Sequence, residues 1–447
     1  MVRGWLARSS TPPMPARLLA RRLSTRGANV RPLAEVVARA LHEGSGNGHG
    51  HGPSLPALEA LTAALPPQPV SILMLRSSAS SRAPRSRLVQ ASWIRRELIA
   101  RRAHILTLLH TMPAPLSGAR AVGQLAGLYW DRLRELLEGP ELATSEDERA
   151  FAQQQSERNE QITKLGTAEE EGMCIDALGQ MQREHGSEFW ATHPAERQAV
   201  DWQLDCIFLA RIGLRVLLEH YVASDAPCDG FAGIVDQRCS PVAVCQAAAS
   251  EVRSHFGREH GAAPTIEVVG DASQTFPFLP SHIRFVVETL LRNSSVATLR
   301  HHHRQHVAAA GREAAPPLPP VRVIVATSDD AVQLKFEDQA GGIRRSSLIN
   351  VWSYRSLDSA WWQPADGLSL PLVRMYCQYF GGSLALVPME GCVRARGQSE
   401  RAPEGRASEH PGQSEHPGQS TSAQSLMPRS DQSLVTSAKQ THRIAAL

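Results

Sequence analysis

The chain has 447 residues, of which 42% are hydrophobic and 20% charged. This length allows two or three domains with substantial cores and excludes a peptide hormone or a disulfide-stapled miniprotein. The 47 basic and 44 acidic residues nearly balance, and the seven cysteines form no CxxC pair. These features argue against a nucleic-acid binder that works by bulk charge, a disulfide framework and a Cys-rich zinc site. The apolar runs are far shorter than the roughly 20 residues that span a bilayer, so no membrane insertion is expected.

Residues 1–40 have the composition of a mitochondrial transit peptide. Before the first acidic residue, Glu35, the segment carries seven arginines among Ser, Ala and Leu: Arg3, Arg8, Arg17, Arg21, Arg22, Arg26 and Arg31. The alternative is a disordered basic arm, which would not need to exclude acidic residues so completely. We therefore expect import into the mitochondrial matrix. Residues 41–84 contain the stretch GSGNGHGHG and are expected to be a linker.

Apolar residues recur at helical spacing through residues 85–228, which predicts an antiparallel helical bundle. One helix is expected from about residue 90 to Pro113, a second from about residue 122 to Gly139, and a third over residues 202–221. The polar and acidic residues 143–171 predict a loop and a solvated helix between the second and the third.

Residues 229–393 mix helices with short strands, which predicts a two-layer α/β sandwich. Helices are expected over residues 241–256 and 281–300, with a short strand at 265–269. Strands at 321–327 and 331–336 flank a tight turn and predict a β-hairpin. The predicted fold class is therefore α+β, with an N-terminal helical bundle followed by a two-layer sandwich.

Two further segments are expected to lack regular structure. Residues 301–320 are rich in His, Ala and Pro, so we interpret the histidines at 301, 302, 303 and 306 as solvated side chains of a loop rather than as metal ligands. Residues 394–447 repeat the hexapeptide SEHPGQ and predict a disordered tail.

Three separated features of the second domain can carry chemistry. Glu288 and Asn293 interrupt an apolar helix, where a carboxylate can accept a proton and an amide oxygen can ligate Mg²⁺. Asp338 follows a strand and precedes two glycines, so it can accept a hydrogen bond from an exocyclic amine while the backbone approaches the ring closely. The third feature, GLSLP at residues 367–371, opens a helix whose N-terminus suits phosphate. Taken singly, each feature also fits an ordinary helix edge, turn or loop.

Together and in this order, the features resemble the N, G1 and G2 boxes of the ATP-binding fold shared by histidine kinases, type II topoisomerases, chaperones and mismatch-repair ATPases. More closely, the chain resembles the mitochondrial protein kinases of the pyruvate dehydrogenase and branched-chain 2-oxoacid dehydrogenase complexes. The resemblance spans about residues 92–391, with matching segments at 92–113, 204–221, 233–239, 282–297, 338–354 and 367–384.

The resemblance implies a protein-serine kinase that uses ATP and Mg²⁺. Its substrate would be the E1α subunit of a 2-oxoacid dehydrogenase complex, with pyruvate dehydrogenase favoured over the branched-chain enzyme, and phosphorylation would inactivate the complex. The resemblance also implies a homodimer that binds the lipoyl domain of the complex, with no nucleic-acid partner and no membrane insertion.

The resemblance also assigns the site. Asn293 would hold Mg²⁺, Arg292 would replace the usual lysine as a nearby cation, and Asp338 would bind the adenine amine. Glu288 would be the general base, with His282 beside it. The backbone would approach the nucleotide at Gly341 and Gly342. The phosphate loop would be formed by Gly367, Ser369 and Leu370.

Two departures from the family pattern leave an alternative open. Glu288 precedes Asn293 by five residues instead of four, which turns the two side chains roughly 140° apart instead of roughly 40°. A one-residue π-bulge would restore the register. After Cys392 the expected Gly-Thr-Asp is absent, so the last core strand is expected to be missing. The alternative is therefore a catalytically impaired nucleotide-binding regulator of the same complex. A two-component histidine kinase is disfavoured, because no phosphoacceptor-type dimerisation helix or receiver domain is evident.

Overall fold

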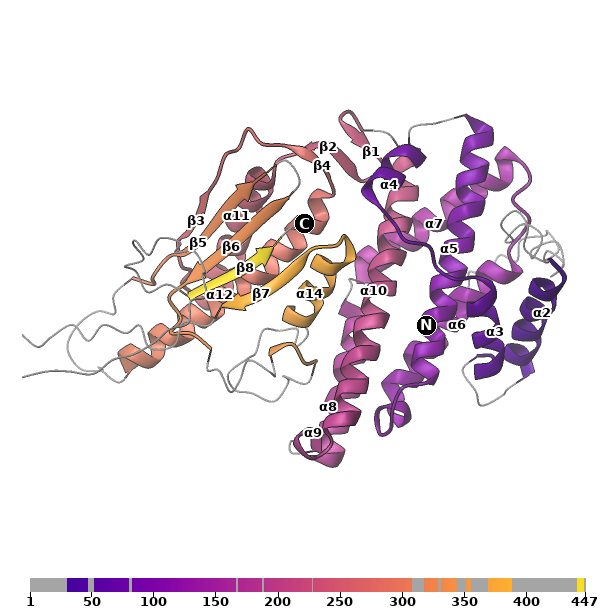
Figure 1. Ribbon diagram of the computed structural model, residues 1–447, viewed down its shortest axis with the longest axis horizontal. Coiled ribbons are helices and arrows are strands. Elements are labelled where there is room, and N and C mark those ends of the chain that lie inside the picture. The colour runs from indigo at the N-terminus through magenta and orange to yellow at the C-terminus, as the bar shows by residue number, and fades with distance from the viewer. Residues whose placement is uncertain are drawn as a thin grey trace, which may run out of the picture.

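The structure is a computed structural model. It describes residues 30–46, 52–79, 83–165, 168–186, 189–226, 228–307, 317–328, 331–343, 351–354, 369–387 and 440–445. Within these residues a helical part ends at Asp225 and a sheet part follows it (Figure 1). The expected α+β class is confirmed. In the part of the chain that the structure describes, every helix is too short or too polar to serve as a membrane span.

Long helices that pack against one another build the helical part. They are α5 (Pro84–His110), α6 (Arg120–Glu138), α7 (Ser145–Leu165) and α10 (Pro194–Asp225). Proline occupies the first turn of α5 and of α10, where its missing N–H costs no helical hydrogen bond. Shorter helices complete this part: η1 (Leu116–Gly118), α8 (Ala168–His185) and α9 (Phe189–Thr192).

The expected linker over residues 41–84 instead carries two helices. After α2 (Val30–Gly46) come α3 (Leu55–Ala64) and α4 (Ile72–Ser78). Leu58, Leu61 and Leu75 are fully buried in the core. The Pro- and Gly-rich flanks concealed these short apolar helices in the sequence. Residues 1–29 of the expected transit peptide lie outside the described residues.

The acidic stretch after α6 is also more ordered than expected. Residues 143–171 were predicted to be a loop and a solvated helix, but α7 packs against both α5 and α10. Phe151 and Glu148 are buried on its inner side. The Glu148 carboxylate accepts a hydrogen bond from the Tyr221 hydroxyl (2.8 Å) and pairs with Arg87 (2.9 Å). Few apolar residues are therefore enough to pack α7 into the core, because Arg87 and Tyr221 satisfy the buried carboxylate of Glu148.

Two sheets follow the helical part. The first is antiparallel, in the order β1 (Phe231–Ala232), β2 (Val235–Cys239), β4 (Phe276–Phe278). The second has the order β3-β5-β6-β8-β7, built from β3 (Ile266–Val269), β5 (Val321–Thr327), β6 (Val332–Asp338), β8 (Gln440–Ala445) and β7 (Ser383–Val387). β3 runs parallel to β5, and the other pairs are antiparallel. The predicted hairpin of β5 and β6 is confirmed.

The expectation that the last core strand is missing was wrong. β8 lies between β6 and β7 and pairs with both, with Asp338 opposite Gln440 and Ala385 opposite Arg443. The family pattern places this strand directly after Cys392, whereas here it lies near the end of the segment expected to be a disordered tail. Residues 394–439 of that segment lie outside the described residues.

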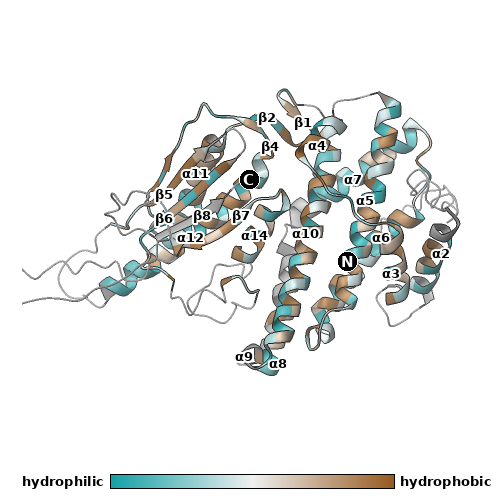
Figure 2. Ribbon diagram, in the orientation of Figure 1, coloured by the Kyte–Doolittle hydropathy of each residue, from teal (hydrophilic) through white to brown (hydrophobic). Residues whose placement is uncertain are grey.

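Three helices contact the second sheet: α11 (Pro241–His260), α12 (Pro280–Val307) and α14 (Ser369–Tyr379). The Ser240 hydroxyl accepts a hydrogen bond from the Ala243 N–H at the start of α11, and Gly261 ends the helix at φ +75°. α12 extends to Val307, so the histidines from 301 onward are helical rather than in a loop. Its far end is strongly hydrophilic (Figure 2). α14 also packs on α10, which joins the two parts (Figure 1).

Candidate functional site

Asn293 lies near the middle of α12, on the buried side of the helix. Its side chain is 7% exposed, next to the buried apolar residues Leu290 and Leu291. The apolar residues hold α12 against β5 and β6, and this packing takes Asn293 out of bulk water. Its amide oxygen is a group of the kind that can ligate Mg²⁺.

Asp338 is the last residue of β6, which contacts α12. It is 2% exposed, and its carboxylate accepts a hydrogen bond from the Ala340 N–H at 3.1 Å. The chain then passes through Gly341 (φ +79°) and Gly342 (φ +87°), a left-handed conformation that favours glycine. A carboxylate acceptor and a bare backbone therefore lie side by side at the end of the strand.

His301 reaches this turn from α12, which the sequence did not predict. A Cβ on Gly341 would lie 2.5 Å from Cε1 of the His301 ring, so the imidazole packs directly on the glycine. Partial burial lowers the pKa of His301, as do Arg304 and His302, while Asp338 acts in the opposite direction. The available signal was helical spacing, since His301 follows Asn293 by two steps of four residues.

Glu288 and Arg292 lie toward α11 instead of joining Asn293. Glu288 pairs with Arg284 at 2.5 Å, and Arg284 also pairs with Glu251 of α11. Arg292 pairs with Glu259 of α11 at 3.3 Å. α12 is an α-helix from Pro280 to Val307, so the π-bulge hypothesis was wrong. The five-residue spacing therefore persists in the structure.

His282 is buried in an aromatic cluster at the start of α12. Its Nε2 lies 2.8 Å from the Tyr376 carbonyl oxygen of α14, and its ring packs edge-on against Phe278 and Phe380. Burial lowers the pKa of His282 to about 4, so the ring is neutral at physiological pH. These contacts link α12 to α14 and do not include Glu288.

The third motif is described only in part. Gly367 lies outside the described residues. α14 begins at Ser369, and the side chain of Leu370 is buried in the core. At the other end the helix stops at Gly381 (φ +87°), whose N–H donates to the Gln378 carbonyl. Gly381 therefore serves as a glycine cap of α14.

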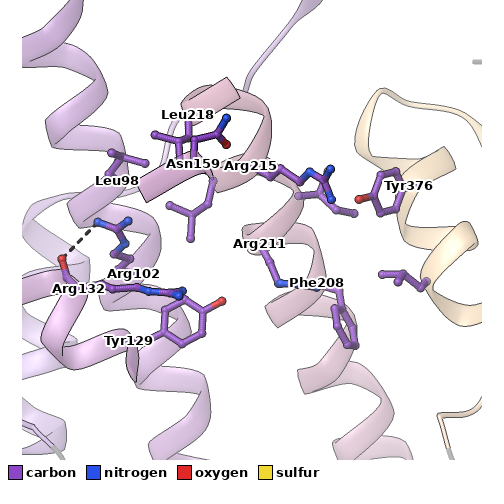
Figure 3. Close-up of a pocket in the computed structure, with 13 residues that line it drawn as sticks. Leu98, Arg102, Tyr129, Arg132, Asn159, Phe208, Arg211, Arg215, Leu218 and Tyr376 are labelled. Atoms are coloured by element: carbon purple, nitrogen blue, oxygen red, sulfur yellow. Dashed lines mark hydrogen bonds between the residues drawn. The ribbon is translucent and has the colours of Figure 1, made fainter. Parts of the chain in front are cut away.

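A second feature is an arginine-lined cavity of about 50 Å³ between the two parts. Arg102, Arg132, Arg211 and Arg215 surround it from α5, α6 and α10, and Tyr376 of α14 closes one side (Figure 3). The Arg102 guanidinium donates to the Arg132 carbonyl oxygen at 3.3 Å. Burial lowers the pKa of Arg102 to about 10, which still leaves it charged at neutral pH. Arg215 already pairs with Glu219 at 2.7 Å, and apolar side chains such as Leu98 and Ile212 form much of the remaining lining.

Among the described residues, no group of three or more His, Cys, Asp or Glu side chains is placed to hold a metal ion. A single amide oxygen, such as that of Asn293, together with oxygens of a bound nucleotide is a different kind of donor set. That donor set suits Mg²⁺, which prefers oxygen and is commonly shared between protein and phosphates.

Comparison with known proteins identifies the family. A family model described as mitochondrial branched-chain alpha-ketoacid dehydrogenase kinase matches residues 69–236. The mitochondrial pyruvate dehydrogenase (acetyl-transferring) kinase of Arabidopsis thaliana is 30% identical over 341 residues, which cover 72% of this chain and 87% of that protein. The chain belongs to the mitochondrial pyruvate dehydrogenase kinase family. As a member of this family of protein-serine kinases, it is a transferase.

Two further relatives carry the same kinase name. The mitochondrial pyruvate dehydrogenase kinase of Schizosaccharomyces pombe is 31% identical over 208 residues, which cover 42% of this chain and 47% of that protein. Isozyme 1 of Mus musculus is 23% identical over 394 residues, which cover 83% of this chain and 86% of that protein. Similarity to pyruvate dehydrogenase kinases therefore extends across both the helical part and the sheet part.

Proposed function

We propose that the protein phosphorylates a serine of the E1α subunit of a mitochondrial 2-oxoacid dehydrogenase complex and thereby inactivates it. Pyruvate dehydrogenase is the favoured substrate, because relatives that are matched over 86–87% of their own length are named for it. One observation carries the proposal. Asn293 and Asp338 are both buried on contacting elements, and two glycines of positive φ, Gly341 and Gly342, come three and four residues after Asp338. These are the chemical groups that a magnesium nucleotide needs.

The helical part and the sheet part are proposed to be a bundle domain and an ATP-binding sandwich. The Asn293 amide oxygen would hold Mg²⁺ and the Asp338 carboxylate would accept from the adenine amine, with the backbone at Gly341 and Gly342 close to the ring. The N-terminus of α14, with the preceding loop from Gly367 through Ser369 and Leu370, would face the phosphates. Bound MgATP supplies the phosphoryl group, and the protein contributes position and charge.

The observed contacts of Glu288, Arg292 and His282 suggest a different role for these side chains. Arg284 neutralises Glu288, Glu259 holds Arg292, and His282 packs under α14. We propose that these three side chains fix α12 in place. The proposed location is the mitochondrial matrix, and the proposed partners are E1α, the lipoyl domain and a second copy of the chain.

Phosphate transfer to purified E1α tests the proposal. With labelled ATP and the full chain, we expect labelled serine on E1α. Asn293→Ala should abolish labelling through loss of the magnesium ligand, whereas Gln153→Ala on the exposed side of α7 should keep it. Glu288→Gln should leave kcat within about threefold, because Arg284 already neutralises the carboxylate.

Each result has a clear meaning. Nucleotide binding without labelling would favour the non-catalytic regulator over the kinase. A loss of about 100-fold or more in kcat on Glu288→Gln would restore this residue as the general base.

A further inference from the structure

Two carboxylates on α10 face the sheet part. Asp201 and Asp205 are four residues apart, so they lie on the same side of the helix. α10 belongs to the helical part, but the hydrogen-bond and ion-pair partners described below all belong to the sheet part. Neither carboxylate contributes to the nucleotide site proposed above.

Asp205 holds two groups at once. Its carboxylate accepts a hydrogen bond from the Tyr354 hydroxyl at 2.7 Å and pairs with the Arg374 guanidinium of α14 at 2.8 Å. The Tyr354 side chain is fully buried and stacks on Phe208 of α10 at 5.4 Å. Arg374 lies over the ring of Trp352, 5.6 Å from its centroid. The Asp205 and Arg374 side chains are only 24% and 22% exposed, so water screens this ion pair less than a surface pair.

Asp201 holds the same segment by its backbone. Its carboxylate accepts hydrogen bonds from the Tyr354 N–H at 3.2 Å and from the Ser353 hydroxyl at 3.1 Å. The Ser353 side chain is itself 4% exposed. One turn of α10 therefore fixes both residues 351–354 and α14 against the helical part.

The attachment of α14 to α10 affects the proposed nucleotide site. α14 starts at Ser369, directly after the loop that we propose for the phosphates, and it packs on α12, which carries Asn293. On its α12 side the Tyr376 carbonyl lies 2.8 Å from His282 and the Tyr376 ring stacks on Phe285, and on its α10 side Arg374 pairs with Asp205. A shift of α14 toward or away from α10 would therefore change the distance between its N-terminus and Asn293.

We infer that Asp205 is a positioning residue for the nucleotide: by holding Arg374 and Tyr354 on α10, it sets where the N-terminus of α14 lies relative to Asn293. The inference rests on the proposed nucleotide site. A positioning role differs from a purely structural role in its effect on nucleotide affinity. Loss of the attachment should weaken nucleotide binding beyond any effect on overall stability.

The test uses the full chain and Asp205→Asn, which keeps the size of the side chain and removes its charge. We expect the Kd for a fluorescent ATP analogue with Mg²⁺ to rise about tenfold, and KM for ATP to rise in parallel while kcat stays within about twofold. Asp225→Asn is the matched control, because it breaks an ion pair of the same helix, with Arg87 at 3.1 Å, inside the helical part. Its Kd should stay unchanged.

A milder variant keeps the inference testable if Asp205→Asn does not fold. Tyr354→Phe removes only the hydroxyl that donates to Asp205, and it should raise Kd by a smaller factor. In a double-mutant cycle, the variant with both Arg374→Gln and Asp205→Asn should bind the nucleotide no more weakly than the weaker of the two single variants. The reason is that each substitution breaks the same ion pair.

The outcomes separate this inference from the kinase proposal. Asp205→Asn and Tyr354→Phe proteins that melt earlier but bind the nucleotide as tightly as the wild type would overturn the positioning role. A raised Kd in a protein that never phosphorylates E1α would support the inference and contradict only the kinase assignment. A wild-type protein that binds no nucleotide would overturn both.

Discussion

At the scale of single residues, the turn after β6 depends on one glycine and one histidine. Gly341 has a left-handed backbone and no room for a side chain, because the His301 ring occupies the space where a Cβ would lie. In the sequence, the glycine pair after Asp338 marks Gly341. His301 carries no such signal, because a run of histidines before an Ala- and Pro-rich segment is typical of a solvated loop.

Gly341→Ala should weaken nucleotide binding by at least tenfold, since the methyl group meets both backbone strain and the imidazole. Titration of the protein with a fluorescent ATP analogue measures this. Gly261→Ala is the matched control: Gly261 has a similar φ (+75°), but nothing lies within 4 Å of its Cβ position. It should cost stability without changing affinity.

A second variant separates the two causes of the effect. His301→Ala in the Gly341→Ala background opens the space, so it should recover part of the affinity. If the double variant binds no better than Gly341→Ala alone, the imidazole contact does not limit this site.

At the scale of elements, β8 is the least expected strand of the protein. It fills the position between β6 and β7, so every residue from Gln440 to Ile444 has a partner on β6, and Thr441 to Ala445 have partners on β7. Its removal would leave two open strand edges next to Asp338. The strand therefore supports both the sheet and the end of β6 that carries the proposed adenine acceptor.

Arg443→Pro should destabilise the protein strongly, because proline removes a ladder hydrogen bond and cannot be accommodated in a central strand. We expect a loss of about 1–3 kcal/mol in the free energy of unfolding, measured by urea denaturation, because a ladder partner is left without its hydrogen bond. Val269→Pro, at the exposed end of the edge strand β3, should cost clearly less. Equal losses in the two variants would indicate that β8 does not occupy the centre of the sheet.

At the scale of the whole molecule, two buried histidines connect separate elements. His220 of α10 is 1% exposed, and its Nε2 lies 3.0 Å from the Ser78 hydroxyl of α4. His282 joins α12 to α14. Burial lowers the pKa of each to about 4. The unfolded chain takes up protons at these side chains near pH 6.5, whereas the folded protein does so only near pH 4.

Stability should therefore fall as the pH drops from about 6.5 to about 4, with up to about 3 kcal/mol lost for each histidine. Urea unfolding at pH 7, 6 and 5 measures the slope. His220→Gln and His282→Gln should each flatten it, while His303→Gln at an exposed position of α12 should not. An unchanged slope in both buried variants would contradict this assignment.

The sequence by itself determined the main helices and the hairpin of β5 and β6, which follow from the local spacing of apolar residues. Its motifs also pointed to Asn293, Asp338 and Gly341 through resemblance to a known family, and their roles stay predictions. Only the tertiary structure decided which side chains and strands contact one another. It paired Glu288 with Arg284, brought His301 onto Gly341, joined Asp205 to Tyr354 and Arg374, and inserted β8 between β6 and β7. Each of these contacts joins residues whose partner depends on how helices and strands pack, which local sequence does not encode.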